Sequence, residues 1–384
     1  MTRTSDLASR RWLVLFASVF SFFAIGATFF VVPPLIPELV DRFDLSNFEI
    51  GLLMGAISFP AVFLAVPVGL AVDRWQPRKA GLAGLSLMLV GAVSFATAPS
   101  FAILFAGRFF FGIGGLVVNL LLARLLTEAF AERELALAMG IFMATYPASM
   151  ITVFSLQPAL LGALGWRGEL LVLAGLVALA IPLFVIAVGR AGKDRQGEAG
   201  VRPSLRINRS LVALAIGWML FFGVHVSVLT FGPKWAGGGS AALLVVTLVM
   251  WVAMVGSPLV GVLIDRSAGP ARWLVAGHVV QAVVVAAMAA GILPPTAAML
   301  GVGVAAALLP TAAYALPGLL VAPERVGFAF GFITAFSNLG TIVGPAIAGA
   351  LLDARGSFAL VWTVLAALAA AAIGVAAFVR PRSV

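Results

Sequence analysis

The sequence predicts an all-α polytopic membrane protein of twelve transmembrane helices, arranged as two pseudo-symmetric six-helix bundles. Three observations support this: an apolar composition that no soluble fold could bury, apolar runs of membrane-spanning length, and landmarks that recur at a nearly constant offset. Of the 384 residues, 62% are hydrophobic and 10% are charged, whereas soluble chains are nearer half apolar and a quarter charged. About 20 apolar residues span the hydrocarbon core as a helix, so the bilayer suits this composition.

The spans are apolar runs separated by charged or glycine- and proline-rich breaks. The one long polar connection, Gly189–Ser210, falls between the sixth and seventh spans and predicts a solvated linker. We therefore predict a first bundle over residues 1–190, a linker over 191–209 and a second bundle over 210–384. The predicted spans are 12–37, 48–72, 79–98, 102–127, 136–163, 169–190, 210–233, 240–264, 271–292, 296–320, 326–352 and 357–379.

The basic residues predict the orientation. If the N-terminus is cytoplasmic, 18 Lys and Arg residues lie on the cytoplasmic side and 4 on the other, with Arg108 and Arg124 of the fourth span set aside. The positive-inside rule then places both termini and the linker in the cytoplasm. We expect the protein to be a multi-pass protein of the inner membrane. The net charge of +9 therefore reflects topology, and we expect no nucleic-acid partner. With no cysteine and only two histidines, the sequence offers no metal site or catalytic cluster, so we expect neither cofactor nor enzymatic activity.

Internal landmarks indicate a duplication. Asp73-Arg74 recurs as Asp265-Arg266 at an offset of 192, and "RELALAMGIFMA" matches "ERVGFAFGFITA" at an offset of 191. A third pair, Arg167-Gly168 and Arg355-Gly356, is offset by 188. Landmarks that keep their order and spacing predict two parallel copies of one six-helix unit.

Several motifs resemble those of the major facilitator superfamily. "GLAVDRWQPRK" resembles the family's pattern G-x-x-x-D-R-x-G-(x)-R-K between the second and third helices, departing from it at Gln76. "RFFFGIGG" resembles the fourth-helix motif, "LLTEAFAERELALAMGIF" the following loop, and "GWRGELLVLAGL" the entry to the sixth helix. The resemblance covers essentially the whole chain and implies the major facilitator fold. A closer likeness is to cyanate-permease and nitrate/nitrite-type members, which implies small or anionic solutes.

The resemblance implies gates at the cytoplasmic ends of the helices. In the family, contacts of the acidic residue in the loop between the second and third helices hold the halves together when this side is shut. The alternative is that the basic residues only anchor the loops inside. The candidate gating residues are Gly69, Asp73, Arg74, Arg78, Lys79, Arg124, Glu128, Asp265, Arg266 and Arg272, with Arg124 and Glu128 placed as an i, i+4 ion pair.

Arg108 is the one basic residue well inside a predicted span. An unpaired charge in the bilayer costs several kcal/mol, so we expect Arg108 to face the bundle interior or a wet cavity. Arg108, Gly112, Gly115 and Asn119 share one helix face. Two readings remain open: an anion contact at the transport site, or a structural arginine bound to backbone carbonyl groups of a neighbouring helix.

Other polar residues of the spans complete the candidate substrate site. The candidates are Arg108, Asn119, Tyr146, His225, Tyr314 and Asn338, with the helix assignments implied by the resemblance. No acidic residue falls near the middle of a predicted span, so His225, Glu49 and Glu38 are the candidates for binding a coupling proton. Exchange against a counter-anion, or facilitated diffusion, needs no such group.

The leading function is therefore a secondary active or facilitative transporter. A monomer would move a small, anionic solute by alternating access through a cavity between the two halves. The alternative is a proton-coupled exporter of drugs or amphipathic compounds, which an aromatic cavity and an Arg108 bound to the backbone would favour. A membrane enzyme or a non-transporting sensor is a third class, but an enzyme would need a catalytic cluster that the sequence lacks.

Overall fold

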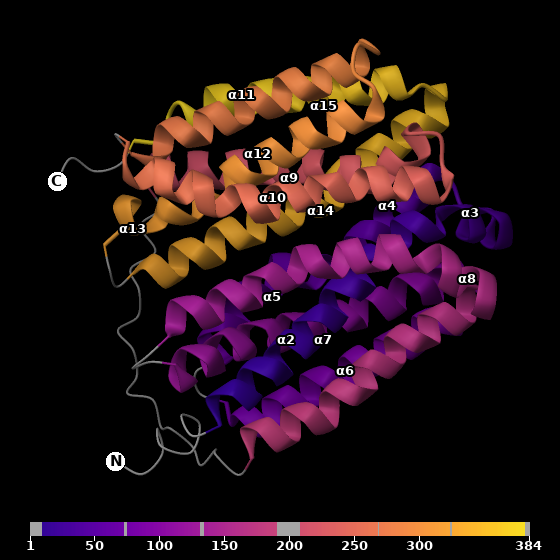
Figure 1. Cartoon of the computed structure of the whole chain (residues 1–384), viewed down its shortest axis with the longest axis vertical. Helices are drawn as coiled ribbons and strands as arrows, with labels where there is room; N and C mark the ends of the chain where they lie inside the picture. Colours follow the sequence, from indigo (N-terminus) through magenta and orange to yellow (C-terminus); the bar gives the residue numbers. More distant parts are fainter. Residues whose placement is uncertain are drawn as a thin grey trace. The chain divides into compact units, whose positions relative to one another are not determined.

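In a computed structural model, the described residues are 10–72, 75–130, 134–189, 208–267, 269–322 and 325–380. Every regular element in these ranges is a helix (Figure 1). The first part of the chain forms α2 (Arg11–Phe30), α3 (Val32–Phe43), α4 (Asn47–Ala56), α5 (Phe59–Val72), α6 (Pro77–Ala96), α7 (Phe101–Ala129) and α8 (Leu135–Val188). The second part forms α9 (Arg209–Trp235), α10 (Gly239–Asp265), α11 (Pro270–Ala289), α12 (Pro295–Ala315), α13 (Pro317–Leu320), α14 (Val326–Arg355) and α15 (Phe358–Ala376).

Within the described ranges, eleven helical stretches are long and apolar enough to cross a membrane. One of them, Leu137–Val188, has 52 residues, more than twice the length that a crossing needs. Its helix, α8, leaves helical geometry at Gly165, where φ is 67° and ψ is 172°. Glycine adopts this left-handed φ without the clash that a Cβ would cause. The break divides α8 into two crossings, which correspond to the separate fifth and sixth predicted spans.

The second predicted span is also interrupted, because α4 ends at Ala56 and α5 begins at Phe59. The start of α4 is defined by a capping box: Ser46 Oγ accepts from the Glu49 backbone N–H, and the Glu49 carboxylate accepts from the Ser46 N–H. This arrangement satisfies two of the backbone donors that a helix start leaves free. α4 is therefore a short, sharply started helix.

Contacts divide the chain into two compact units. The first unit comprises Met1–Val31 and Phe59–Val201, and the second comprises Val32–Ser58 and Arg202–Val384. This division differs from the predicted bundle boundary, because residues 32–58 pack with the later helices. The reason is the close packing of α4 on α14 (Figure 1). A Cβ added at Gly55 would lie 2.7 Å from Ile342 Cα, so glycine is what permits this approach.

The first unit is organised around tight contacts between α6 and α7. A Cβ at Gly91 would lie 2.5 Å from the Gly107 carbonyl oxygen, and one at Gly107 would lie 2.7 Å from the Phe95 nitrogen. Small residues at helix interfaces let backbones approach and gain van der Waals contact where the lipid supplies no hydrophobic drive. α8 packs on α2 and α6, which completes the core of this unit.

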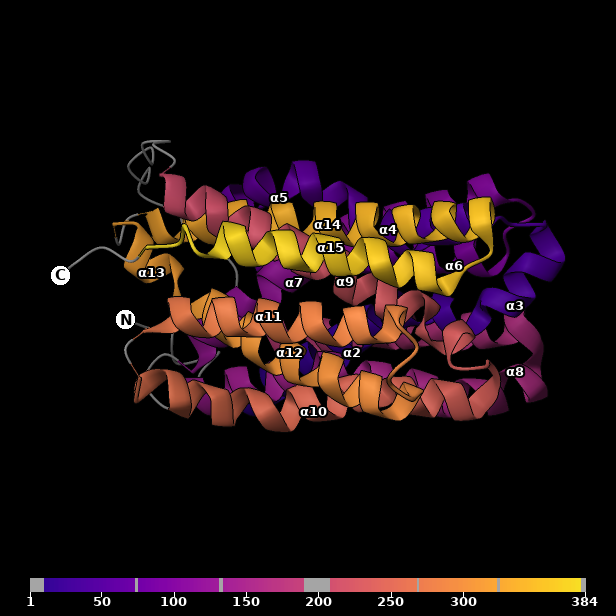
Figure 2. The same cartoon turned by 90° about the horizontal axis from the view of Figure 1, so that it is seen from above.

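The second unit packs α9 on α14, and Figure 2 shows α11 between α12 and α15. Its core includes fully buried aliphatic side chains such as Leu214, Leu274 and Leu309 around Trp218.

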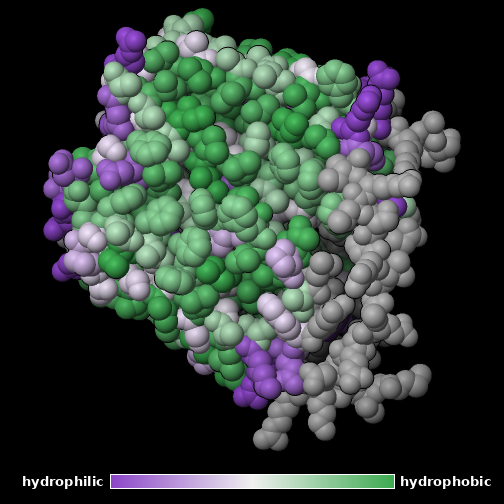
Figure 3. Space-filling view, turned by 180° about the vertical axis from the view of Figure 1, so that it is seen from behind, coloured by the Kyte–Doolittle hydropathy of each residue, from purple (hydrophilic) through white to green (hydrophobic). Residues whose placement is uncertain are grey.

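Hydrophobic residues cover most of the face drawn in Figure 3, and hydrophilic residues gather at its margins. An apolar surface of this kind is what a bilayer requires of the helices that it surrounds.

Candidate functional site

Arg108 lies in α7 and is fully buried, with 0% of its surface exposed. Its Nη1 donates to the Thr28 carbonyl oxygen at 2.8 Å, and its Nη2 donates to the Phe29 carbonyl oxygen at 3.3 Å. Both acceptors are in the last turn of α2, where backbone carbonyl groups commonly lack a partner within the helix. The guanidinium also lies over the Phe95 ring, 5.6 Å from its centroid. This geometry favours the structural reading of Arg108 over a solute contact.

Tyr146 is the polar member of an aromatic cluster in the first unit. It is half-buried in α8, and its ring centroid lies 4.9 Å from that of Phe30 and 6.1 Å from that of Phe22. Phe29, whose carbonyl group binds Arg108, is 6.2 Å away by the same measure. The cluster therefore joins Tyr146 to the end of α2 that Arg108 holds. Asn119 is half-buried, eleven residues beyond Arg108 on α7.

A second aromatic cluster lies in the second unit and contains both His225 and Tyr314. Phe221 stacks on Trp218 at 5.2 Å and on His225 at 5.1 Å between ring centroids. Tyr314 meets Trp218 edge-on at 5.6 Å and is 54% exposed. His225 is 7% exposed, and its Nδ1 has no hydrogen-bond partner among the described residues. The two tyrosines of the chain thus each belong to an aromatic cluster, one in each unit.

Asn338 is the last of the predicted substrate residues, and it lies half-buried on α14. Its Nδ2 donates to the Thr334 carbonyl oxygen of its own helix at 2.8 Å. One amide hydrogen is therefore already used locally, and the remaining amide groups are available to another partner.

The predicted gating residues of the first unit are only partly described. Asp73 and Arg74 lie outside the described residues. Gly69 is half-buried, whereas Arg78 and Lys79 are exposed at the start of α6. The expected ion pair is present, since Arg124 Nε lies 2.9 Å from Glu128 Oε1. Its part in a gate stays a prediction.

The corresponding residues of the second unit are Asp265, Arg266 and Arg272. All three are exposed, at the end of α10 and the start of α11. Asp265 makes no ion pair with another described residue. Their exposure leaves these side chains accessible to a partner in another conformation.

Sequence reasoning missed Asp353, which lies in the last turn of α14. Its Oδ1 accepts from the Asn47 backbone N–H at 2.9 Å and from Asn47 Nδ2 at 2.6 Å. Its Oδ2 accepts from the Phe48 N–H at 2.8 Å, and Lys234 Nζ donates to Asn47 Oδ1 at 2.9 Å. A carboxylate at a helix start satisfies free N–H groups and is stabilised by the helix dipole. We call Asp353, Asn47, Phe48 and Lys234 the Asp353 cluster; it ties α4 to α14 and α9.

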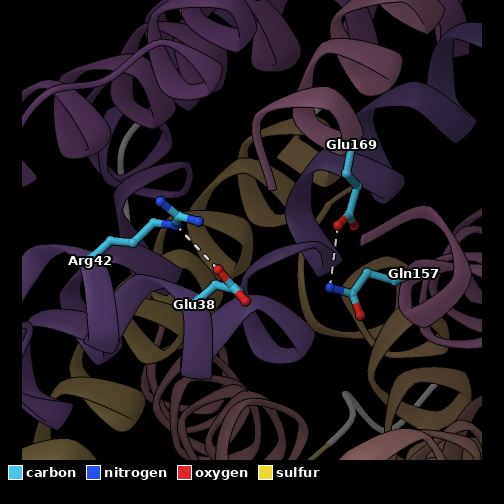
Figure 4. A network of polar contacts seen from close by, with 4 residues as sticks. All are labelled: Glu38, Arg42, Gln157 and Glu169. Carbon is cyan, nitrogen blue, oxygen red and sulfur yellow. Dashed lines mark hydrogen bonds and ion pairs between the residues drawn. The ribbon is translucent and has the colours of Figure 1, made fainter. Parts of the chain in front are cut away.

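Glu169 is a second residue that the sequence analysis passed over. It is 2% exposed, and its Oε2 accepts from Gln157 Nε2 at 3.3 Å across the break at Gly165 (Figure 4). Figure 4 also shows Glu38 and Arg42 of α3, an ion pair that is far more exposed than Glu169. Arg42 Nε lies 3.2 Å from Glu38 Oε2. A buried carboxyl with an amide partner can hold or release a proton, as a proton-coupled carrier requires. The signal available in the sequence was its position as the first residue of the predicted sixth span, 169–190.

The family is established by comparison with known proteins. The model of the Major Facilitator Superfamily matches residues 14–240 and 236–384, and the chain belongs to this family. The chain is therefore a transporter-type membrane protein, as the motifs in the sequence predict. The fold agrees: the solved structure of the nucleoside transporter NupG is similar with a TM-score of 0.79 and 12% identity, covering 96% of this chain and 99% of that one. The predicted all-α polytopic fold is confirmed.

The names of two curated relatives mention different solutes. The lysosomal dipeptide transporter MFSD1 of Danio rerio is 24% identical over 348 residues, covering 83% of this chain and 76% of the relative. The nitrite extrusion protein of Bacillus subtilis (strain 168) is 23% identical over 363 residues, covering 89% and 87%. The second relative agrees with the resemblance to nitrate/nitrite-type members, and together they leave the solute of this chain open.

Proposed function

We propose that this chain is a secondary transporter that moves a small amphipathic organic solute by alternating access between its two repeats. The observation that carries the choice of solute is the geometry of Arg108. Its guanidinium is fully buried and donates to the carbonyl groups of Thr28 and Phe29. The buried cation that suggested an anionic solute is thus occupied by backbone.

The remaining candidate groups are aromatic and neutral. Tyr314 is half exposed beside Trp218, and Tyr146 is half-buried beside Phe30. Aromatic rings with a hydroxyl or ring nitrogen bind solutes that have an apolar body and a few polar groups. This chemistry corresponds to the exporter of amphipathic compounds that the sequence left as the alternative.

A small anion is the second candidate function. It is supported by the likeness to a nitrite extrusion protein over 89% of this chain. In that case the anion would be bound by neutral donors of one unit, such as His225 and Asn338 of the second, rather than by Arg108. Anion binding by neutral donors has precedent in the physical chemistry of backbone N–H groups.

Counterflow in proteoliposomes separates the two candidates. Vesicles loaded with an amphipathic organic compound or with nitrite are diluted into a radioactive trace of each, and uptake is compared between wild type and Tyr314→Ala. We expect exchange of organic compounds and a loss of about tenfold in Tyr314→Ala, because stacking area and a hydroxyl are removed. Tyr314→Phe keeps the ring and should lose less.

Phe63→Ala is the matched control, since Phe63 is an exposed aromatic of α5 outside both clusters. Exchange of nitrite without exchange of organic compounds would overturn the proposed solute class. Equal losses in Tyr314→Ala and Phe63→Ala would remove Tyr314 from the site.

We further propose that the Asp353 cluster is a latch on the side that the charge count places outside. It joins α4 to α14 and α9. In the predicted duplication, α4 belongs to the first six-helix repeat, and α14 and α9 belong to the second. Opening that side would require these hydrogen bonds to break, because each one bridges elements of different repeats. The exposed Asp265, Arg266 and Arg272 would serve the opposite side, together with Asp73 and Arg74.

A further inference from the structure

A cavity of about 610 Å³ lies in the first unit, and none of its lining residues belongs to either aromatic cluster. It is formed by the loop before α6 and by facing stretches of α6 and α7. Trp75, Gln76 and Lys79 line one end, and Ala83, Leu87 and Val117 line its length. Its volume lies within the range typical of small-molecule sites.

Close packing of small residues shapes this cavity. A Cβ added at Gly84 would lie 2.8 Å from Val118 Cγ2 and 3.2 Å from the Gly114 carbonyl oxygen. The two helices therefore touch along glycines, and on one side of this contact only alanines and a few longer aliphatic chains fill the space. The apolar part of the cavity, lined by Ala83, Leu87 and Val117, therefore follows the axis of α6, and we call it the apolar channel.

The channel changes character along its length. Lys79 is exposed in the first turn of α6, beside the exposed Arg78, and Trp75 is 40% exposed at the rim. Leu87 is eight residues further on, a rise of about 12 Å. Val90, 58% exposed, continues the same face of the helix. α6 contains no acidic residue to neutralise these cations.

This order of groups corresponds to that of a membrane lipid. Lys and Trp side chains are enriched where headgroups meet the hydrocarbon, and basic pockets beside membrane helices bind anionic headgroups. A soluble anion would be attracted by Lys79 but would gain nothing from the apolar channel beyond it. We infer that this cavity binds one anionic phospholipid, with its phosphate at Lys79 and an acyl chain along Ala83, Leu87 and Val117.

The test uses the full-length chain in phosphatidylcholine vesicles that contain phosphatidylglycerol with brominated acyl chains. Bromine quenches tryptophan at short range, and the contribution of Trp75 is the difference between wild type and Trp75→Phe. We expect this contribution to be quenched more by brominated phosphatidylglycerol than by brominated phosphatidylcholine at equal mole fraction. In Lys79→Gln the preference should fall about fivefold, as for the loss of one cation near an anionic surface.

Arg209→Gln is the matched control, because Arg209 is an exposed basic residue in the first turn of α9 and does not line the cavity. It should leave the preference unchanged. Ala83→Leu keeps the charge and fills the channel, so it should reduce quenching of Trp75 by both brominated lipids. Quenching of the remaining tryptophans reports that each variant is folded in the bilayer.

Three outcomes would overturn the inference. The first is equal quenching of Trp75 by the two brominated lipids. The second is an equal loss of preference in Lys79→Gln and Arg209→Gln, which would indicate a general surface-charge effect. The third is displacement of the brominated lipid by inorganic phosphate, which would indicate a site for a free anion. None of these measurements uses a transported solute, so they stand apart from the proposed function.

Discussion

The two units place their polar side chains differently. In the first unit, the buried ionisable residues Arg108 and Glu169 are hydrogen-bonded to described partners. In the second unit, ring nitrogens of the buried His225 and His278 have no partner among the described residues. The well-bonded charge of that unit, Asp353, lies at the end of α14. The first unit thus uses hydrogen-bonded ionisable side chains to hold its helices, while the second holds unpaired neutral polar groups in its interior and a charge at its end.

The difference has a physical reason. A buried charge is tolerated only when hydrogen bonds replace its hydration, whereas a neutral imidazole is less costly to leave unpaired. A hydrogen-bonded interior charge therefore fixes the helices that it connects, whereas unpaired neutral groups remain able to bind a solute or water. This supports a division of labour in which the second unit contributes more to solute recognition.

Replacing the buried charge of Arg108 should give the largest effect. In Arg108→Met the carbonyl groups of Thr28 and Phe29 lose their donors in a buried place, at a cost of about 1–3 kcal/mol each. In His225→Leu no hydrogen bond to a described residue is lost, so we expect a change below about 1 kcal/mol. The midpoint of thermal unfolding of the purified protein in detergent measures both.

The proposed difference between the units would be wrong if Arg108→Met and His225→Leu had the same unfolding midpoint, or if His225→Leu were the less stable of the two. Arg108→Lys adds a sharper point, because a single ammonium group cannot reproduce the two separated donors of the guanidinium. It should fall between wild type and Arg108→Met.

Opening of the Asp353 cluster should have an intermediate effect. In Asp353→Asn an amide NH₂ replaces one of the two acceptor oxygens, so one N–H at the start of α4 loses its acceptor, and the charge on the helix dipole is lost. Because the chain has no cysteine, an Ile342→Cys substitution beneath α4 gives a single reporter thiol. We expect its maleimide labelling to accelerate about fivefold in Asp353→Asn, equivalent to about 1 kcal/mol.

Glu38→Gln is the control for this experiment, since it breaks only the exposed pair of Glu38 and Arg42 on α3. Its labelling rate should match that of the Ile342→Cys parent. An unchanged rate in Asp353→Asn would mean that the Asp353 cluster does not hold α4 on α14.

Sequence reasoning reached the helices and the interior position of Arg108, because both follow from local composition and the cost of a charge in lipid. It could not choose the partners of Arg108, because these depend on where α2 ends against α7. Asp353 was missed for a related reason: it and Asn47 are 306 residues apart. Glu169 was missed because the predicted sixth span began at that residue, and the ends of spans are the least certain part of such predictions.

The smallest effect is expected at Arg124, which offers a comparison within one helix. Arg124 and Arg108 both belong to α7, but Arg124 is only partly buried and pairs with Glu128 one turn away. Partly exposed i, i+4 pairs contribute about 0.3–0.5 kcal/mol, because water and salt screen them. Arg124→Gln should therefore shift the unfolding midpoint far less than Arg108→Met. A shift of similar size would show that burial does not explain the role of Arg108, whereas altered transport at unchanged stability would support the gating role of Arg124.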